Sequence, residues 1–186
     1  MKVAIYCGSS SGNDNKFIEQ TKKLGKYLAQ NNIDLVYGGG KVGLMGTIAD
    51  SFLENGAKVY GVIPEKLVEK ELAHPQLTDL TIVKTMHERK AIMAEMADAF
   101  ITLPGGAGTL EEIFEAWTWA QLGYHNKPCA FYNIDGFYDD LFNMLETMTK
   151  KAFLKEEYLN MLINTSDEKK LLSEIKSYKA PSEKWN

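Results

Sequence analysis

Three glycine-rich segments are the parts of this sequence that could bind a ligand through the backbone. They are Gly8–Gly12 (GSSSG), Gly38–Gly43 (GGGKVG) and Pro104–Thr109 (PGGAGT), and each lies between a short apolar run and a stretch with helical patterning. Amides left accessible by glycine at the start of a helix can bind an anion, because the helix dipole favours negative charge there. A single loop of this kind would more simply be a tight turn, since glycine is usual wherever φ is positive. Three such loops together favour a ligand site carried on a scaffold.

The third loop leads directly into a group of acids. The segment Gly105–Thr109 fits a phosphate cradle, with the Thr109 hydroxyl as an added donor, and Glu111, Glu112 and Glu115 follow it. If Thr109 caps the helix, Glu112 completes a capping box and its role is structural. The alternative is a carboxylate that points past a bound phosphate. In a nucleoside monophosphate the ribose lies there, and a carboxylate can stabilise the oxocarbenium-like state of glycosidic cleavage or activate water.

Arg89 and Lys90 begin another predicted helix, where cations oppose the helix dipole. They either form a solvated or salt-bridged face beside Glu88, or they bind phosphate or carboxylate, Arg89 through its planar fork and Lys90 as a point charge. The residues alone leave both interpretations open. Thr118 lies seven positions after Glu111, so both side chains can face the cleft from one side of their helix.

Other familiar motifs fail on their details. Gly38–Gly43 matches the dinucleotide-binding spacing, but it follows the second predicted strand, and about twenty residues later stands Lys58 instead of an acid. A Walker A motif is also excluded, because Val42 takes the place of the required Ser or Thr. The histidines and cysteines lack metal-ligand spacing, so we expect no metal site and no cofactor.

Short apolar runs alternate with helical patterns along the whole chain. The predicted strands are Val3–Cys7, Ile33–Tyr37, Ala57–Ile63, Leu80–Val83, Asp98–Leu103 and Pro128–Tyr132. The predicted helices are Asn15–Gln30, Leu44–Asn55, His87–Met96, Leu110–Leu122 and Tyr138–Lys150. Runs without polar alternation suit strands buried on both faces of a parallel sheet with right-handed crossovers. We therefore predict a single α/β domain over residues 1–186, with a Rossmann-like, doubly wound, mostly parallel sheet and all three loops at one edge.

Two further segments carry expectations of their own. Residues Pro64–Asp79 form a longer polar connection that can act as a flap. Residues 152–186 are expected to be helical, with an amphipathic end at Glu168–Tyr178 that packs on the domain or on a partner.

Composition narrows the class of protein. The chain has 186 residues, of which 45% are hydrophobic and 25% charged, and its net charge is −4 with no basic stripe. These values are typical of a globular protein and argue against a nucleic-acid binder. No run approaches the length of a signal-peptide core or a membrane span, and Cys7 and Cys129 lie in apolar runs. We expect a cytoplasmic protein that binds neither membranes nor nucleic acid.

The pattern as a whole resembles one family. Pro104–Glu112 matches the PGGxGTxxE signature of the LOG (Lonely Guy) family, cytokinin riboside 5′-monophosphate phosphoribohydrolases often mislabelled as lysine decarboxylases. Five more blocks follow the family's order: Cys7–Ser10, Tyr37–Gly40, Gly43–Gly46, Met86–Lys90 and Thr118–Gly123. The resemblance as a whole runs from about Lys2 to Phe142.

The resemblance implies a Rossmann-like homodimer that releases the free base and ribose 5-phosphate from AMP-like nucleotides, including N6-prenylated ones. It assigns Arg89 and Glu112 as the catalytic pair. It also implies a set of substrate-binding residues: Glu71, Lys90, Gly105, Gly106, Ala107, Gly108, Thr109, Glu111 and Thr118. We expect Ser9, Gly39, Gly40 and Met86, which stand in the other glycine-rich loops and in the Met86–Lys90 block, to bind substrate as well. Ala107 stands where many members carry Tyr.

Two other functions are alternatives to hydrolysis. Related Rossmann-like proteins carry phosphorylated ligands such as molybdenum cofactor without hydrolysing them, but the presence of both Arg89 and Glu112 favours the enzyme. An NAD-dependent oxidoreductase would need an acid at the ribose that the sequence lacks. Nothing in the sequence suggests a pyridoxal site with a Schiff-base lysine.

Overall fold

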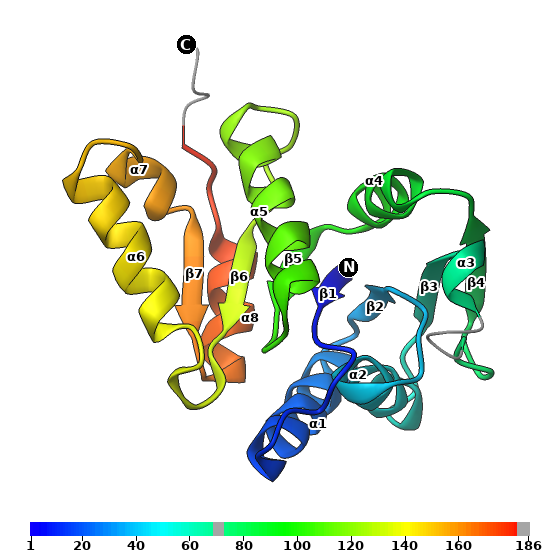
Figure 1. Ribbon diagram of the computed structural model, residues 1–186. Helices are drawn as coiled ribbons and strands as arrows, with labels where there is room; N and C mark the ends of the chain where they lie inside the picture. The colour runs from blue at the N-terminus through cyan, green and yellow to red at the C-terminus, as the bar shows by residue number, and fades with distance from the viewer. Residues whose placement is uncertain (69–72, 182–186) are drawn as a thin grey trace.

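The structure is a computed structural model that describes residues 1–68 and 73–181. Seven described strands form one sheet in the order β4-β3-β2-β1-β5-β6-β7, and every neighbouring pair is parallel (Figure 1). The strands are β1 (Lys2–Tyr6), β2 (Asp34–Tyr37), β3 (Val59–Pro64), β4 (Asp79–Val83), β5 (Ala99–Thr102), β6 (Cys129–Tyr132) and β7 (Leu162–Thr165). The helices are α1 (Asn15–Gln30), α2 (Gly43–Glu54), α3 (Glu65–Val68), α4 (Met86–Met96), α5 (Ala107–Gln121), α6 (Asp139–Lys150), α7 (Glu156–Leu159) and α8 (Glu168–Ser177), with a 3-10 turn η1 at Ile134–Gly136.

The strand order reverses between β1 and β5. From β1 the chain builds outward through β2 and β3 to β4, then returns to place β5 on the other side of β1 and continues to β6 and β7. In open parallel sheets the crevice at such a reversal, beyond the carboxyl ends of the strands, is where ligands bind. The loops that follow β1 and β5 are the first and third glycine-rich segments, so they flank this crevice.

Helices cover both faces of the sheet and enclose two apolar cores. One core joins α1, α2 and α8 to the sheet, with Leu28, Phe52 and Leu171 fully buried. The other joins α4, α5 and α6 to the opposite face, with Met93 and Leu145 fully buried. None of the helices within the described residues is both long and apolar enough to cross a membrane.

The helix starts differ in a way that bears on function. Asp14 caps α1, Asp167 caps α8, and a reciprocal capping box joins Thr85 and Glu88 at the start of α4. No side chain of the described residues caps the starts of α2 and α5, which follow the second and third glycine-rich loops, and the same holds for α6 and α7. The first amides of α5 therefore lack the side-chain acceptor that helix starts usually have.

The predicted doubly wound Rossmann-like fold is confirmed, and all six predicted strands and five predicted helices exist with bounds shifted by at most three residues. The tail beyond residue 151 was predicted to be helical, and α7 and α8 lie in it, α8 close to the predicted amphipathic end. The prediction missed β7, which lies between them and pairs with β6 from Cys129↔Leu162 to Tyr132↔Thr165. A four-residue strand between short helices has too few positions to show a period, and its pairing with β6 decides its conformation. The connection predicted to act as a flap, Pro64–Asp79, begins at the last residue of β3 and continues as α3.

Candidate functional site

The three glycine-rich loops meet at the carboxyl edge of the sheet. The amide of Gly8 donates to the Pro104 carbonyl over 3.0 Å, which joins the first loop to the third. The amide of Leu44, in the first turn of α2, donates to the Gly8 carbonyl over 3.1 Å and joins the first loop to the second. The predicted gathering of the loops at one edge is therefore confirmed.

A cavity of about 260 Å³ opens where the loops meet, and we call it the arginine cavity. It brings together residues from α2, α3, α4 and α5 with the first and third loops. Its lining residues are Cys7, Gly8, Ser9, Met45, Leu67, Met86, Arg89, Gly106, Gly108, Thr109, Glu111 and Glu112.

Arg89 enters this cavity from α4 and is 95% buried, since only 5% of its surface is exposed. Its Nη2 donates to the carbonyl of Gly38 over 3.1 Å. A Cβ at position 38 would lie 1.8 Å from Nη2, so only glycine leaves room for the guanidinium in this place. The interpretation of Arg89 as part of a solvated helix face is therefore wrong, and the adjacent Glu88 is occupied by the capping box.

Glu112 lines the same cavity from α5. The helix begins at Ala107 with Gly106 as its N-cap, so Thr109 lies inside the first turn and does not cap it. The capping box expected from Thr109 and Glu112 is absent from the described residues, because the helix starts three residues earlier than predicted. Glu112 is thus half-buried in the wall of the cavity, one turn beyond the helix start.

Packing does not require glycine at positions 106 and 108. Apart from the neighbouring residues of the chain and the helix's own nearby backbone, no atom of the described residues lies within 4 Å of the position that a Cβ would take at either residue, and neither has a positive φ. Gly105 differs, since a Cβ there would lie 2.1 Å from Oγ1 of Thr109. The open space above Gly106 and Gly108 allows a ligand to approach the uncapped start of α5.

Lys90 is buried behind this wall and is held by two carboxylates. Its Nζ lies 2.5 Å from Oε1 of Glu111 and 3.0 Å from Oε2 of Glu115. Burial acts to lower the pKa of Lys90, but hydrogen bonds and charges from Glu111 and Glu115 outweigh it and raise the pKa above its ordinary value. Lys90 is therefore a protonated point charge.

Burial also affects the pKa values of two groups at the cavity, Cys7 and Tyr6. Burial raises the pKa of the Cys7 thiol, the charge of Glu112 raises it further, and Arg89 opposes this. Burial likewise raises the pKa of Tyr6, with Glu112 as the next contributor. Both groups stay neutral, which makes Cys7 unsuited to act as a thiolate nucleophile.

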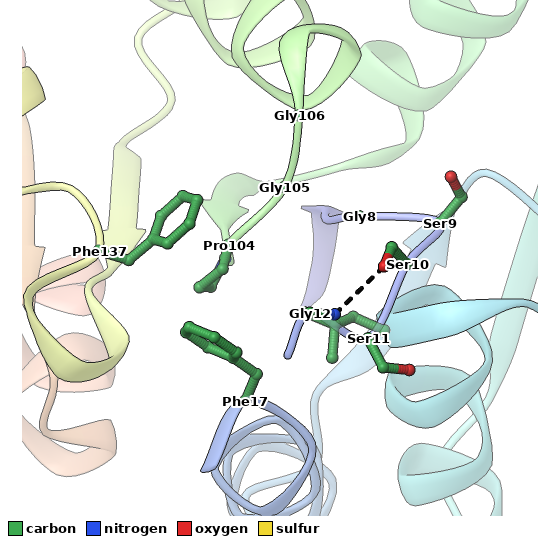
Figure 2. A pocket seen from close by; sticks show the side chains of 11 residues that line it. Gly8, Ser9, Ser10, Ser11, Gly12, Phe17, Pro104, Gly105, Gly106 and Phe137 are labelled. Carbon is green, nitrogen blue, oxygen red and sulfur yellow. Dashed lines mark hydrogen bonds between the residues drawn. The ribbon is translucent and has the colours of Figure 1, made fainter. Parts of the chain in front are cut away.

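A second cavity of about 330 Å³ adjoins the first, and we call it the serine-loop cavity. Figure 2 shows Phe17 and Phe137 on one side of it and the Ser9–Gly12 loop on the other, with Pro104 between them. The two phenylalanine rings meet edge to face with centroids 5.9 Å apart. Gly8, Ser9 and Gly106 line both cavities, so the two spaces meet at the first and third loops.

The remaining predicted site residues fall into three groups. Gly105 lines the serine-loop cavity, and the buried Gly39 and Gly40 lie in the loop whose Gly38 holds Arg89. Ala107 and Thr118 are exposed on α5 and are not among the residues that line the arginine cavity. Glu71 lies outside the described residues.

Sequence reasoning omitted several residues from the site. Cys7, Gly8, Met45 and Leu67 line the arginine cavity. Three of these stand in or beside the blocks that carry the family resemblance, and that was the available signal. Leu67 lies in the connection read as a flap, where one apolar residue has no distinguishing pattern. No group of three or more His, Cys, Asp or Glu in the described part of the chain is placed to hold a metal ion.

A doubly wound sheet whose crevice holds a buried arginine, open glycines at a helix start and a carboxylate defines a Rossmann-like α/β protein with a site suited to an anionic ligand. The model of the family described as "Possible lysine decarboxylase" matches residues 45–175. The chain is 41% identical over 177 residues to the cytokinin riboside 5′-monophosphate phosphoribohydrolase LOG of Oryza sativa subsp. japonica, covering 95% of this chain and 73% of the relative. It is also 41% identical to the phosphoribohydrolase LOG2 of Arabidopsis thaliana, covering 95% and 83%. The chain belongs to this LOG family.

Solved structures share the fold at much lower identity. The molybdenum cofactor binding protein of Rippkaea orientalis superposes with a TM-score of 0.72 at 19% identity, covering 95% of both chains. The Moco carrier protein of Chlamydomonas reinhardtii gives a TM-score of 0.71 at 15% identity, covering 94% of both chains. These similarities concern the fold alone.

Proposed function

We propose that this protein hydrolyses the N-glycosidic bond of nucleoside 5′-monophosphates, with N6-modified adenosine 5′-monophosphates as the substrate class. The products are the free base and ribose 5-phosphate. The proposal is supported by the activity named for the LOG relatives, which are about 40% identical over most of the chain. The observation that carries it is the open space at Gly106 and Gly108, beside Arg89 and Glu112 in one cavity.

The phosphate binds to the first amides of α5, between Gly106 and Thr109. Two glycines without side chains let its oxygens reach the amide protons, and the helix dipole stabilises the negative charge. Ser9 adds a polar group beside the third loop, and Lys90 adds a fixed positive charge from behind the cavity wall, where Glu111 and Glu115 pair with it. We include Met86 among the substrate contacts, as the sequence analysis expects, and Glu111 and Thr118, as the family resemblance implies.

The ribose then lies over Arg89 and Glu112. In the reaction the bond between C1′ and the base nitrogen breaks and the bonding electron pair leaves with the base. An oxygen of water forms a new bond to C1′, and the proton that water gives up balances the protonation of the base. Glu112 stabilises the positive charge that develops on the ribose or accepts the proton of the attacking water. Arg89 orients the phosphate or the ribose through its planar guanidinium.

The name lysine decarboxylase finds no support in the cavity. A Schiff-base lysine must be deprotonated to attack a carbonyl group. The two carboxylates beside Lys90 raise its pKa and keep the ammonium charged. Its place fits a fixed positive charge instead of a nucleophile.

The assay that tests this function measures the base released from AMP and from isopentenyladenosine 5′-monophosphate. We expect turnover by the wild type and a loss of about 10²- to 10⁴-fold in kcat for Glu112→Gln, which keeps the shape of the side chain but removes its charge. Glu54→Gln, at the exposed end of α2, is the control and should leave kcat unchanged. Tight nucleotide binding without any release of base would instead favour a carrier of phosphorylated ligands.

The proposal includes a homodimer, as the family resemblance implies, and a cytoplasmic location, as the sequence analysis expects. Light scattering coupled to size-exclusion chromatography tests the dimer, for which a mass of twice 20.9 kDa is expected.

A further inference from the structure

His74 is a buried histidine that the proposed reaction does not use. Only 3% of its surface is exposed, and it lies in the connection between α3 and β4. Its ring contacts α2, and its backbone contacts the second glycine-rich loop.

The ring of His74 connects this segment to α2. Nδ1 accepts a hydrogen bond from the amide of Gln76 over 3.2 Å, so the ring proton must lie on Nε2. Nε2 in turn lies 2.9 Å from Oδ1 of Asp50, which accepts that proton's hydrogen bond. Asp50 stands in the middle of α2, and its side chain is 47% exposed.

The backbone of the same residue holds the second glycine-rich loop. The amide of His74 donates to the Gly39 carbonyl over 2.9 Å, and Ala73 forms an antiparallel bridge with Gly40. Gly39 has φ +81°, which glycine adopts about as readily as a negative φ, so its freely rotating backbone relies on contacts such as the His74 hydrogen bond to stay in this one conformation. The preceding residue, Gly38, is the one whose carbonyl accepts the hydrogen bond from Arg89.

The same segment also contributes to the arginine cavity. Leu67 of α3 lines that cavity, and the amide of Ala73 donates to the Val68 carbonyl over 3.1 Å. Contacts of residues 73 and 74 therefore connect the end of α3, the glycine loop and α2.

We propose that His74 is a positioning residue, whose bond to Asp50 fixes the Gly38–Gly40 loop and thereby the guanidinium of Arg89. The inference rests on the proposed function, because it assigns His74 a role in the reaction of that site. The chain of contacts is short: Asp50 holds the ring, the His74 amide holds Gly39, and Gly38 holds Arg89.

Two substitutions of His74 test the contributions of its two ring nitrogens separately. His74→Asn places a polar group near Nδ1 but leaves nothing near Nε2, whereas His74→Gln can place an amide near Nε2 and donate to Asp50. For His74→Asn we expect kcat to fall about tenfold while KM changes less than threefold. Small displacements of an orienting group lower the rate strongly, and the phosphate-binding amides lie on another loop. For His74→Gln we expect kcat within about threefold of the wild type. The glutamine amide restores the hydrogen bond to Asp50 but not the acceptor for the amide of Gln76, so a small loss remains.

The control is His125→Asn. Nδ1 of His125 also accepts a hydrogen bond from the amide two positions later, that of Lys127, over 3.2 Å. His125 does not line either of the two loop cavities. It should leave kcat unchanged. Asp50→Ala removes the acceptor from a half-exposed position and should reproduce the loss of kcat, which tests the inference even where His74→Asn does not fold.

A second measurement does not depend on turnover. Amide hydrogen exchange at residue 74, followed by NMR, should become at least tenfold faster in His74→Asn and in Asp50→Ala, and stay slow in His74→Gln. The inference is overturned if His74→Asn and Asp50→Ala keep full kcat, if His74→Gln is as impaired as His74→Asn, or if exchange at residue 74 is unchanged. A wild type that releases no base would overturn the proposed function, and the exchange experiment would still decide whether the ring holds the loop.

Discussion

At the scale of single residues, the glycines of the third loop divide by what surrounds them. Gly105 is required by packing against Thr109, whereas Gly106 and Gly108 face open space. The sequence shows these three residues as equivalent, and only their surroundings distinguish a packing role from a ligand-binding role.

This difference predicts opposite effects of the same substitution. Gly108→Ala should keep or slightly raise stability, because alanine favours a helix by up to about 1 kcal/mol over glycine, yet it should raise KM at least tenfold by blocking the phosphate. Gly105→Ala is the comparison and should lower the melting temperature, since its Cβ meets Thr109. Thermal unfolding and steady-state kinetics measure both. A Gly108→Ala variant with wild-type KM would contradict the phosphate site.

The charge cluster behind the cavity predicts a pH dependence. Lys90 has a raised pKa in the folded protein, so its interaction with Glu115 stabilises the fold fully below the unfolded lysine value of about 10.4 and is lost as the pH rises through the folded value. Glu115→Gln removes part of this stabilisation. The difference in unfolding free energy between wild type and variant should stay constant from about pH 7 to 9 and shrink above about pH 10.4.

Urea denaturation at a series of pH values measures that difference. Glu146→Gln, whose carboxylate pairs with the exposed Lys150, is the control and should show a much smaller difference at every pH. A difference for Glu115→Gln that grows with rising pH would contradict the assignment of Lys90 as the titrating group.

At the scale of the elements, the C-terminal ends of α2 and α6 have the same backbone geometry but different residues. Gly56 and Ala152 both adopt left-handed conformations, with φ +80° and +62°. In both, the next residue's amide donates back to the last full turn, from Ala57 to Phe52 and from Phe153 to Met148. This ending normally selects glycine, so α6 carries strain that α2 avoids.

The contrast predicts that Ala152→Gly stabilises the protein by about 0.5–1 kcal/mol, equivalent to a rise of about 1–4 °C in melting temperature. Gly56→Ala is the mirror-image control and should destabilise by a similar amount, because no atom of the described residues crowds its Cβ position and only the backbone conformation opposes it. Both variants should keep wild-type kinetics. Equal melting temperatures for the wild type, Ala152→Gly and Gly56→Ala would contradict the strain inferred at Ala152.

At the scale of the whole molecule, the tail completes the sheet and contributes buried residues to both cores. β7 adds the last strand beside β6, and α8 places the fully buried Leu171 on the core shared with α1 and α2. Residues 152–177 are therefore part of the folding unit that carries the site.

Leu171→Ala should accordingly destabilise the protein by about 2–5 kcal/mol, as large-to-small substitutions in buried cores do. Ser173→Ala on the exposed side of the same helix should change stability by less than about 0.5 kcal/mol. Urea titrations with an unchanged slope would show the loss as a shift of the midpoint. A midpoint for Leu171→Ala equal to that of Ser173→Ala would mean that α8 does not hold the core.

What the sequence by itself determined is local in character. Apolar runs, helical periodicity and glycine clusters depend on residues a few positions apart, and they were enough to predict the alternating elements, the parallel sheet and the edge at which the loops gather. The family blocks added the prediction of Arg89 and Glu112.

What only the tertiary structure decided depends on residues far apart in the chain. The burial of Arg89 follows from its contact with Gly38, 51 positions away. The conformation of β7 follows from pairing with β6, and the role proposed for His74 rests on its contacts with Gly39 and Asp50. Such contacts leave no period in the sequence, because each partner is brought close only when the strands have taken their order in the sheet.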